Sequence, residues 1–138
     1  MLWRATEQIG DAFAKIQQLE SMGKRCFFVT NNATKLPADA AEKMRKMGYD
    51  TVKLDHVYTS GGCVAKYVVR RYPEAKKVFA IGEKSIRDAL EAEGIEVIGA
   101  NEHILDPSKI VTETDFDNLE LDEDVKAVVY GLDFSYTH

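Results

Sequence analysis

The feature that most constrains the fold of this chain is the alternation of short apolar runs with amphipathic stretches. Between Ile9 and Met22, apolar residues recur at steps of three and four, the spacing of one helix face, and Gly23 ends that pattern. A short run over residues 26–29 follows and predicts a strand buried on both faces. The alternation continues to about residue 98, which predicts right-handed βαβ units and a mainly parallel sheet.

The later elements are expected in the same rhythm. Pro37 is placed to begin a helix whose inner face is Ala41, Met44 and Met47. The remaining expected elements are a weak strand at 56–58, a helix from Cys63 toward Pro73, a strand at 77–81, a helix at 85–93, and strands at 95–98 and 125–130. No period is visible between 99 and 124. The seven acidic residues within 113–124 favour a solvated loop with a short helix over a metal site.

Composition and charge exclude several classes of protein. Among 138 residues, 18 Lys and Arg against 23 Asp and Glu give a net charge of −5, which argues against a nucleic-acid or anionic-membrane binder. No apolar run approaches the length that a bilayer requires, and no signal-peptide core follows Met1. The two cysteines, Cys26 and Cys63, cannot form a disulfide framework or a four-ligand zinc site. They are interpreted as buried thiols in a reducing compartment, the cytoplasm.

Polar or glycine-rich segments follow three of the expected strands, where ligands bind in open α/β sheets. Thr30, Asn31 and Asn32 offer a hydroxyl, two amides and several backbone N–H groups, which suit a phosphate or another oxyanion. From the residue types alone, a simple turn is the favoured interpretation. The segment 59–62 is interpreted as a helix cap, because it lacks the lysine of a P-loop. The third polar segment contains Gly82, which predicts a tight turn.

The sequence offers few candidate catalytic residues. The three histidines have no spacing that suggests a metal pair, and no G-x-G-x-x-G pattern indicates a dinucleotide site. Cys26 lies in an apolar run, where a thiol packs rather than attacks. Asp133 follows an expected strand and is either a site carboxylate or, more commonly, a turn former. The residues alone therefore predict an α/β domain with one plausible anion-binding loop.

Several segments resemble one branch of the haloacid dehalogenase (HAD) superfamily of phosphatases. It is the branch of 4-nitrophenylphosphatases, phosphoglycolate phosphatases and pyridoxal phosphate phosphatases. The most specific segment is Phe28-Val29-Thr30-Asn31-Asn32-Ala33-Thr34-Lys35, a Thr-Asn-Asn turn after an apolar strand. The resemblance spans essentially the whole chain, and its other segments are 2–4, 23–25, 42–43, 47–48, 59–60, 78–82, 94–95 and 127–136.

The resemblance implies a fold and a chemistry. The fold would be α/β, with a partial Rossmann-like HAD core over residues 1–76 and the first part of an inserted α/β cap over residues 77–138. Members of the family are Mg²⁺-dependent phosphatases. In a D-x-D pattern after the first strand, one aspartate attacks phosphorus to give an aspartyl-phosphate and the other is general acid and base. Thr30 would bind a phosphate oxygen, with Asn31 and Asn32 beside it.

The sequence also departs from the family's pattern. Leu2-Trp3 matches the end of the family's D-x-D-G-V-L-W pattern, so both aspartates would lie upstream of Met1, and no other aspartate follows a strand in that arrangement. The family's lysine and its later Mg²⁺ ligands would fall after His138. We therefore expect no catalytic residue and no metal ligand in this chain, and an inactive product. Each part would expose apolar faces, which predicts partial order or pairing with another chain.

Three functional hypotheses follow. In the first, the chain is a truncated form of a cytoplasmic phosphatase whose substrate is a phosphorylated small molecule or a phosphoprotein. In the second, it is a non-catalytic module that binds a phosphorylated ligand through Thr30, Asn31 and Asn32, or that associates with an intact homologue or with itself as a homo-oligomer. In the third, it is an unrelated flavodoxin-like binding domain, which predicts a complete central sheet.

Overall fold

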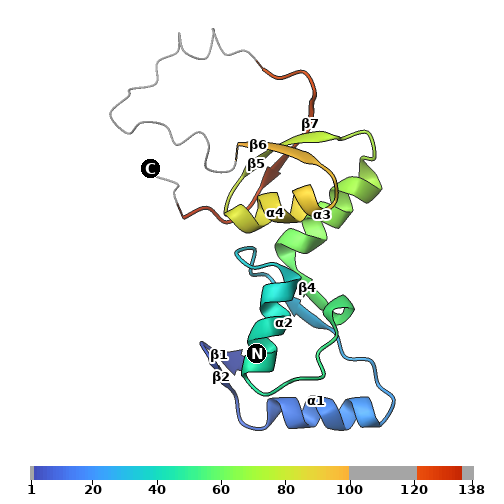
Figure 1. Cartoon of the computed structure of the whole chain (residues 1–138), viewed down its shortest axis with the longest axis vertical. Coiled ribbons are helices and arrows are strands. Elements are labelled where there is room, and N and C mark those ends of the chain that lie inside the picture. Colours follow the sequence, from blue (N-terminus) through green and yellow to red (C-terminus); the bar gives the residue numbers. More distant parts are fainter. Residues whose placement is uncertain (1, 100–120, 135–138) are drawn as a thin grey trace. The chain divides into compact units, whose positions relative to one another are not determined.

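The computed structural model describes residues 2–99 and 121–134 (Figure 1). The chain divides into two compact units, Met1–Cys63 and Val64–His138. Helix α3 (Ser60–Arg71) begins in the first unit and ends in the second. The assignment of residues 1–76 to a core and 77–138 to a cap stays a prediction.

The first unit is built on a short parallel sheet with helices packed on it. Its elements are β1 (Trp3–Arg4), β2 (Glu7–Gln8), α1 (Ala12–Ser21), β3 (Phe28–Thr30), α2 (Pro37–Lys46), a 3₁₀ turn η1 (Leu54–His56) and β4 (Val57–Thr59). Strands β3 and β4 are parallel, with Thr30 opposite Thr59 at their carboxyl ends. Because the strands are parallel, the two loops that follow them leave from the same edge of the sheet.

The two helices of the first unit form where the spacing of apolar residues predicted them. Helix α1 buries Phe13 and Ile16, and α2 buries Ala41 and Met44. Pro37 occupies the first turn of α2, where a missing N–H costs nothing. Both helices are followed by a glycine at positive φ, the left-handed conformation that commonly ends a helix.

The core of the first unit is organised around Tyr49. Its ring lies 5.2 Å from the ring of Phe13 and 5.5 Å from that of Phe28, measured between centroids, and the residue is fully buried. Burial, with the Glu20 carboxylate nearby, raises the pKa of the phenol to about 12. The other buried members of this core are Ile16, Ala41, Met44, Val52 and Val57.

The prediction that the strand at 26–29 is buried on both faces is wrong for this structure. Phe28 is buried, but Phe27 is 50% exposed and Val29 77% exposed, because side chains alternate across a strand and only one face meets the core. Tyr58, opposite Val29 in the register, is also exposed. The expectation of an uncovered apolar face is thus confirmed for this sheet.

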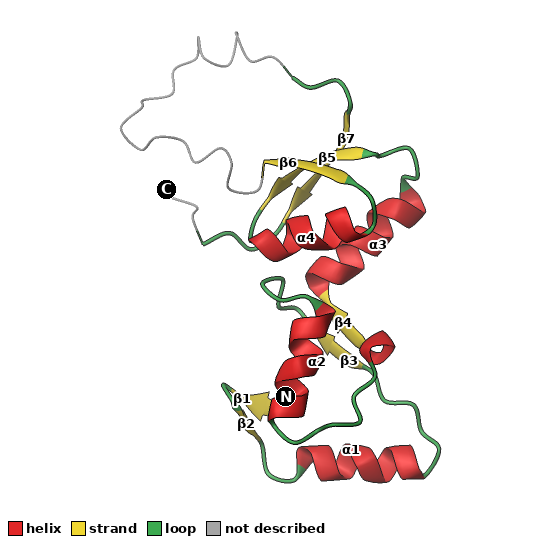
Figure 2. Ribbon diagram, viewed as in Figure 1, coloured by secondary structure: helices red, strands yellow, loops and turns green. Residues whose placement is uncertain are grey.

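The second unit holds a three-stranded parallel sheet in the order β6-β5-β7 (Figure 2). Strands β5 (Lys77–Ile81), β6 (Glu96–Gly99) and β7 (Val125–Tyr130) match the predicted strands closely, and α4 (Lys84–Ala92) connects β5 to β6. The central strand buries Val78 and Ala80, and α4 buries Ile86, Ala89 and Leu90. Val128 and Tyr130 are 68% and 69% exposed, so this sheet also presents an uncovered apolar face.

An ionic cluster joins the amino ends of the strands in the second unit. The Lys77 ammonium lies 2.9 Å from a carboxylate oxygen of Glu96 and 2.8 Å from one of Asp122. The hydrogen bond from Lys77, and then the N–H of Asp124, hold the pKa of Asp122 below its ordinary value. The cluster ties β5, β6 and the segment before β7 together at one rim.

Other features differ from the sequence prediction or lie outside the described residues. Trp3–Arg4 and Glu7–Gln8 pair as an antiparallel hairpin that no pattern indicated. Cys26 is half-buried and Cys63 is exposed, so the interpretation of Cys63 as a buried thiol is wrong: it lies on the outer side of the first turn of α3. The loop predicted between 99 and 124 lies mostly outside the described residues. None of the described helices is both long enough and apolar enough to cross a bilayer.

Candidate functional site

The turn after β3 is shaped by its own side chains. The Thr30 hydroxyl oxygen accepts a hydrogen bond from the Asn32 N–H at 3.1 Å. Asn32 Oδ1 in turn accepts hydrogen bonds from the N–H and the hydroxyl of Thr34, each at 2.8 Å. Such side-chain-to-backbone bonds fix a turn without secondary structure. The sequence Thr-Asn-Asn-Ala-Thr therefore sets the conformation of the turn locally.

A hydrogen bond ties this turn to the neighbouring strand. The Ser60 hydroxyl, directly after β4, donates to the Asn31 carbonyl at 2.9 Å. Thr59 Oγ1 accepts the N–H of Gly62 at 3.3 Å, which confirms the interpretation of segment 59–62 as a helix cap. A Cβ on Gly62 would lie 3.2 Å from Pro37, so this glycine allows the starts of α2 and α3 to approach closely. The two loops at this edge of the sheet therefore brace one another.

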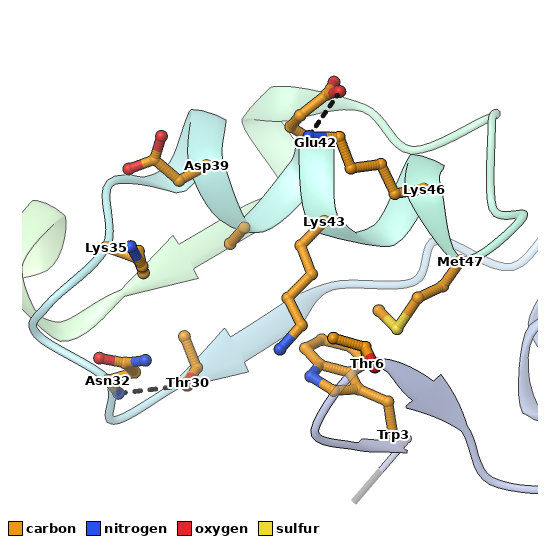
Figure 3. Close-up of a pocket in the computed structure, with 11 residues that line it drawn as sticks. Trp3, Thr6, Thr30, Asn32, Lys35, Asp39, Glu42, Lys43, Lys46 and Met47 are labelled. Atoms are coloured by element: carbon orange, nitrogen blue, oxygen red, sulfur yellow. Dashed lines mark hydrogen bonds and ion pairs between the residues drawn. The ribbon is translucent and has the colours of Figure 1, made fainter.

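An open pocket of about 620 Å³ lies beside the turn (Figure 3). Its wall combines groups from the β1–β2 hairpin, the end of β3, the turn and one face of α2. The lining residues are Trp3, Thr6, Thr30, Asn32, Lys35, Asp39, Ala40, Glu42, Lys43, Lys46 and Met47.

The carboxylates of the pocket are already engaged, whereas two of its lysines are not. Glu42 pairs with Lys46 at 3.7 Å and with Arg45 at 3.6 Å. Asp39 accepts the Leu36 N–H at 3.1 Å, at the start of α2. Within residues 2–99 and 121–134, neither Lys35 nor Lys43 has a carboxylate within ion-pair distance, and the Lys43 ammonium lies 6.0 Å from the centroid of the Trp3 ring. The pocket therefore carries unneutralised positive charge.

Of the three residues predicted to bind phosphate, Thr30 and Asn32 line the pocket. Asn31 is exposed and does not line it, and its carbonyl is the acceptor of the Ser60 hydroxyl. Sequence reasoning missed Trp3, Lys35 and Lys43. Lysines are common on solvated helix faces, and no spacing in the sequence distinguishes Lys43 from its neighbours.

The comparable loop of the second unit is closed. At the carboxyl end of β5, the Gly131 N–H donates to the Ile81 carbonyl at 2.9 Å and the Glu83 N–H donates to the Leu132 carbonyl at 2.8 Å. Gly82 has a φ of 140°, and a Cβ there would lie 2.7 Å from Ile86 Cδ1 and 3.0 Å from the Leu132 oxygen. The tight turn predicted at Gly82 is confirmed.

The described residues do not assemble a metal site. In the part of the chain that the structure describes, no three His, Cys, Asp or Glu side chains lie close enough together to hold a metal ion. Asp122 and Asp124 have D-x-D spacing, but they precede β7 rather than follow a strand, and Asp122 is paired with Lys77.

The chain belongs to the haloacid dehalogenase-like hydrolases, whose family model matches residues 1–96. Two relatives are named as phosphatases. It is 33% identical to 4-nitrophenylphosphatase of Schizosaccharomyces pombe, covering 100% of this chain and 46% of the relative. It is 31% identical to glycerol-3-phosphate phosphatase of Gallus gallus, covering 99% and 43%. The chain thus spans less than half the length of these relatives.

Solved structures agree with the fold. A p-nitrophenyl phosphatase from Archaeoglobus fulgidus superposes with a TM-score of 0.61 at 28% identity, covering 66% of this chain and 34% of that one. A 4-nitrophenylphosphatase from Thermotoga maritima superposes with a TM-score of 0.71 at 24% identity, covering 100% and 43%. The predicted fold class, α/β with part of a haloacid dehalogenase core, is confirmed.

Proposed function

We propose that this chain belongs to a phosphatase of the haloacid dehalogenase family. We propose further that its Thr30–Asn32 turn binds the phosphoryl group of a phosphate monoester. The observation that carries the proposal is the pocket beside the turn. Thr30 and Asn32 line it together with Lys35 and Lys43, which have no ion-pair partner among the described residues. A hydroxyl, backbone N–H groups and ammonium groups are the donors that a phosphate dianion requires.

The proposed substrate class is the small phosphate monoesters. The relatives are named for 4-nitrophenyl phosphate, glycerol 3-phosphate and phosphoglycolate, which share a terminal phosphate and differ in the rest of the molecule. A site that recognises only what these molecules share would consist of donors to phosphate oxygens. The pocket beside the turn offers such donors from Thr30, Asn32, Lys35 and Lys43.

For the chain as printed we propose that no turnover occurs. The family's mechanism needs an attacking carboxylate, and no aspartate of the described residues follows a strand in a D-x-D arrangement. Incubation with 4-nitrophenyl phosphate and Mg²⁺ should therefore release no 4-nitrophenol above the rate without protein. Activity that co-purifies with the chain and is abolished by Thr30→Ala would show that the nucleophile has been misplaced.

Phosphate binding is tested directly on the intact chain. Titration with inorganic phosphate, followed through the backbone amides of Thr30 and Asn32 by NMR, should give saturable shifts. Thr30→Ala should weaken binding about tenfold, because charge-assisted hydrogen bonds are the strong ones. Ser21→Ala is the control, since the Ser21 hydroxyl bonds to the Gln18 carbonyl on α1, outside the pocket. Shifts that never saturate, or equal affinities in both variants, would contradict the proposal.

The proposed setting is the cytoplasm, and the proposed partners exclude nucleic acids and membranes. The net charge of −5 supports the exclusion of nucleic acids and anionic membranes, because both carry negative charge.

The exposed apolar faces of β3 and β7 support association with a second copy of the chain. Sedimentation velocity over a range of concentrations should show a monomer converting to a larger species, and a monomer at every concentration would contradict it.

A further inference from the structure

Of two lysines on the same face of α2, one is paired with a carboxylate and the other is not. Lys46 is exposed and lies 3.7 Å from a carboxylate oxygen of Glu42. Lys43 is half-buried, and in residues 2–99 and 121–134 it has no carboxylate or hydrogen-bond acceptor as a partner. An ammonium without an anionic partner beside an open pocket is available to an anionic ligand.

The ammonium of Lys43 points into the open pocket. Figure 3 shows the side chain descending from α2 into the space between Thr30, at the end of β3, and the indole of Trp3. The ammonium lies 6.0 Å from the centroid of that ring, at the limit of a cation–π contact. Trp3 itself is held by Phe13, whose ring centroid lies 6.2 Å away. The indole is thus a positioned surface, and the ammonium rests loosely on it.

We propose that Lys43 is a phosphate-binding residue whose ammonium is held on the Trp3 indole when the pocket is empty and moves onto the phosphate oxygens when a phosphate monoester binds. This inference rests on the proposed function and extends it to a residue outside the Thr30–Asn32 turn. The attraction between an ammonium and a dianion exceeds that between an ammonium and a ring quadrupole, so the bound anion draws Lys43 off the indole.

The competing structural explanation gives Lys43 no ligand. In that case its methylenes pack on Trp3 and hold the β1–β2 hairpin against α2, as long charged side chains often do. The two explanations differ in a measurable way. If Lys43 only packs, its substitution lowers stability but leaves phosphate affinity unchanged. If Lys43 binds phosphate, its substitution lowers phosphate affinity, and phosphate binding changes the surroundings of the Trp3 indole.

Movement of the Lys43 ammonium away from the indole should change the fluorescence of Trp3. The signal is unambiguous because Trp3 is the only tryptophan of the chain. The experiment titrates inorganic phosphate into the full chain and follows Trp3 fluorescence together with the amide signals of Thr30 and Asn32. In the unsubstituted chain, both signals should change with the same apparent dissociation constant. In Lys43→Met, the amides should still respond, at phosphate concentrations about tenfold higher, while the fluorescence stays constant.

Three further variants make the result specific. Lys46→Met removes a positive charge from the same helix and pocket, but one already paired with Glu42, so affinity should fall less than about twofold. Lys43→Arg keeps the charge and should hold affinity within about threefold, which would assign the loss in Lys43→Met to the missing charge. Thr30→Ala should weaken both signals in parallel.

The outcomes separate this inference from the function on which it rests. Equal losses in Lys43→Met and Lys46→Met, or full phosphate affinity in Lys43→Met, overturn the role of Lys43 and leave the turn as a phosphate site. A constant Trp3 signal in the unsubstituted chain while the amides saturate does the same. Absence of saturable amide shifts in the unsubstituted chain overturns the phosphate site itself.

Discussion

The loop after β3 in the first unit and the loop after β5 in the second start from the same local design. Each follows the carboxyl end of a parallel strand and leads into a helix, α2 or α4. The loop after β3 is braced by side chains, and its hydroxyl and amide groups border a pocket. The loop after β5 is covered by residues 131–134: the Gly131 N–H donates to the Ile81 carbonyl, the Leu132 carbonyl accepts the Glu83 N–H, and the Phe134 N–H donates to the Glu83 carboxylate.

This difference shows that the carboxyl end of a parallel strand is a common position for a binding site, but that its position alone does not create the site. What matters is whether another segment of the chain covers the groups at that end. Those of the second unit are paired with the chain segment after β7, and Gly82 leaves no room for a side chain. Those of the first unit are bonded within the turn and to Ser60, and the Thr30 and Asn32 side chains border an open pocket.

The closed end of β5 gives the largest expected effect. Gly82→Ala should destabilise the second unit by at least about 2 kcal/mol, because a disfavoured backbone conformation and overpacking each cost about 1–3 kcal/mol. The measurement is urea unfolding followed by NMR signals of the second unit. Gly94→Ala is the matched control: Gly94 has a φ of 79°, but a Cβ added there would have no atom within 4 Å, so only the backbone cost applies. Equal losses in the two variants would mean that the end of β5 is not tightly closed.

The cores of the two units should differ in alkali. The phenol of Tyr49 in the first unit has a pKa of about 12, whereas the pKa of a tyrosine in the unfolded chain is about 10. Its contribution to folding is therefore complete below pH 10 and is lost as the pH rises toward 12, by up to roughly 1.4 kcal/mol per pH unit. The measurement is the urea midpoint of the first unit from pH 9 to 11.5. Tyr49→Phe should flatten this decline, and an identical decline in the variant contradicts the assignment.

The brace between the two loops of the first unit has a smaller effect. Ser60→Ala removes the hydrogen bond to the Asn31 carbonyl and should lower stability by about 0.5–1.5 kcal/mol, and phosphate affinity by about threefold. The comparison is Ser21→Ala, another exposed serine that donates to a carbonyl, at 2.8 Å. That variant should change stability alone. An unchanged phosphate affinity in Ser60→Ala would show that the turn needs no brace.

The smallest effect is expected at the rim of the second sheet, where Lys77 and its partners meet solvent. The pKa of Asp122 is lowered by Lys77, so its contribution is present above its ordinary pKa of about 3.8 and is lost as the pH falls further. Lys77→Met should raise the pKa of Asp122, measured by carboxyl-carbon NMR. Lys84→Met, which removes the partner of Asp88 on α4, should leave Asp122 unchanged. A pKa of Asp122 unaffected by Lys77→Met would contradict the pairing.

Much of the fold was predictable because its elements are apolar and regular. The strands at 77–81 and 125–130 contain the apolar runs 78–81 and 127–130, which are typical of parallel strands, and the strand bounds agree with the structure. The β1–β2 hairpin was missed because two strands of two residues leave no alternation to detect. The burial of Val29 was overestimated because an apolar run does not reveal which of its faces is covered.

The candidate site was predictable only in part, and for a geometric reason. Thr30 and Asn32 are neighbours in the sequence, so their shared turn is a local property that residue types reveal. Trp3 and Lys43 are forty residues apart and meet only through the packing of the hairpin against α2. Local patterns carry no information about such a pair.

The two uncovered sheet faces have a practical consequence for anyone working with this chain. Phe27 and Val29 on one sheet, and Val128 and Tyr130 on the other, offer a hydrophobic dye such as ANS a place to bind while both sheets remain intact. Dye fluorescence is commonly taken as a sign of a molten globule. For this protein we expect a bright dye signal from the native state, so loss of folding is better followed through near-UV dichroism or amide signals.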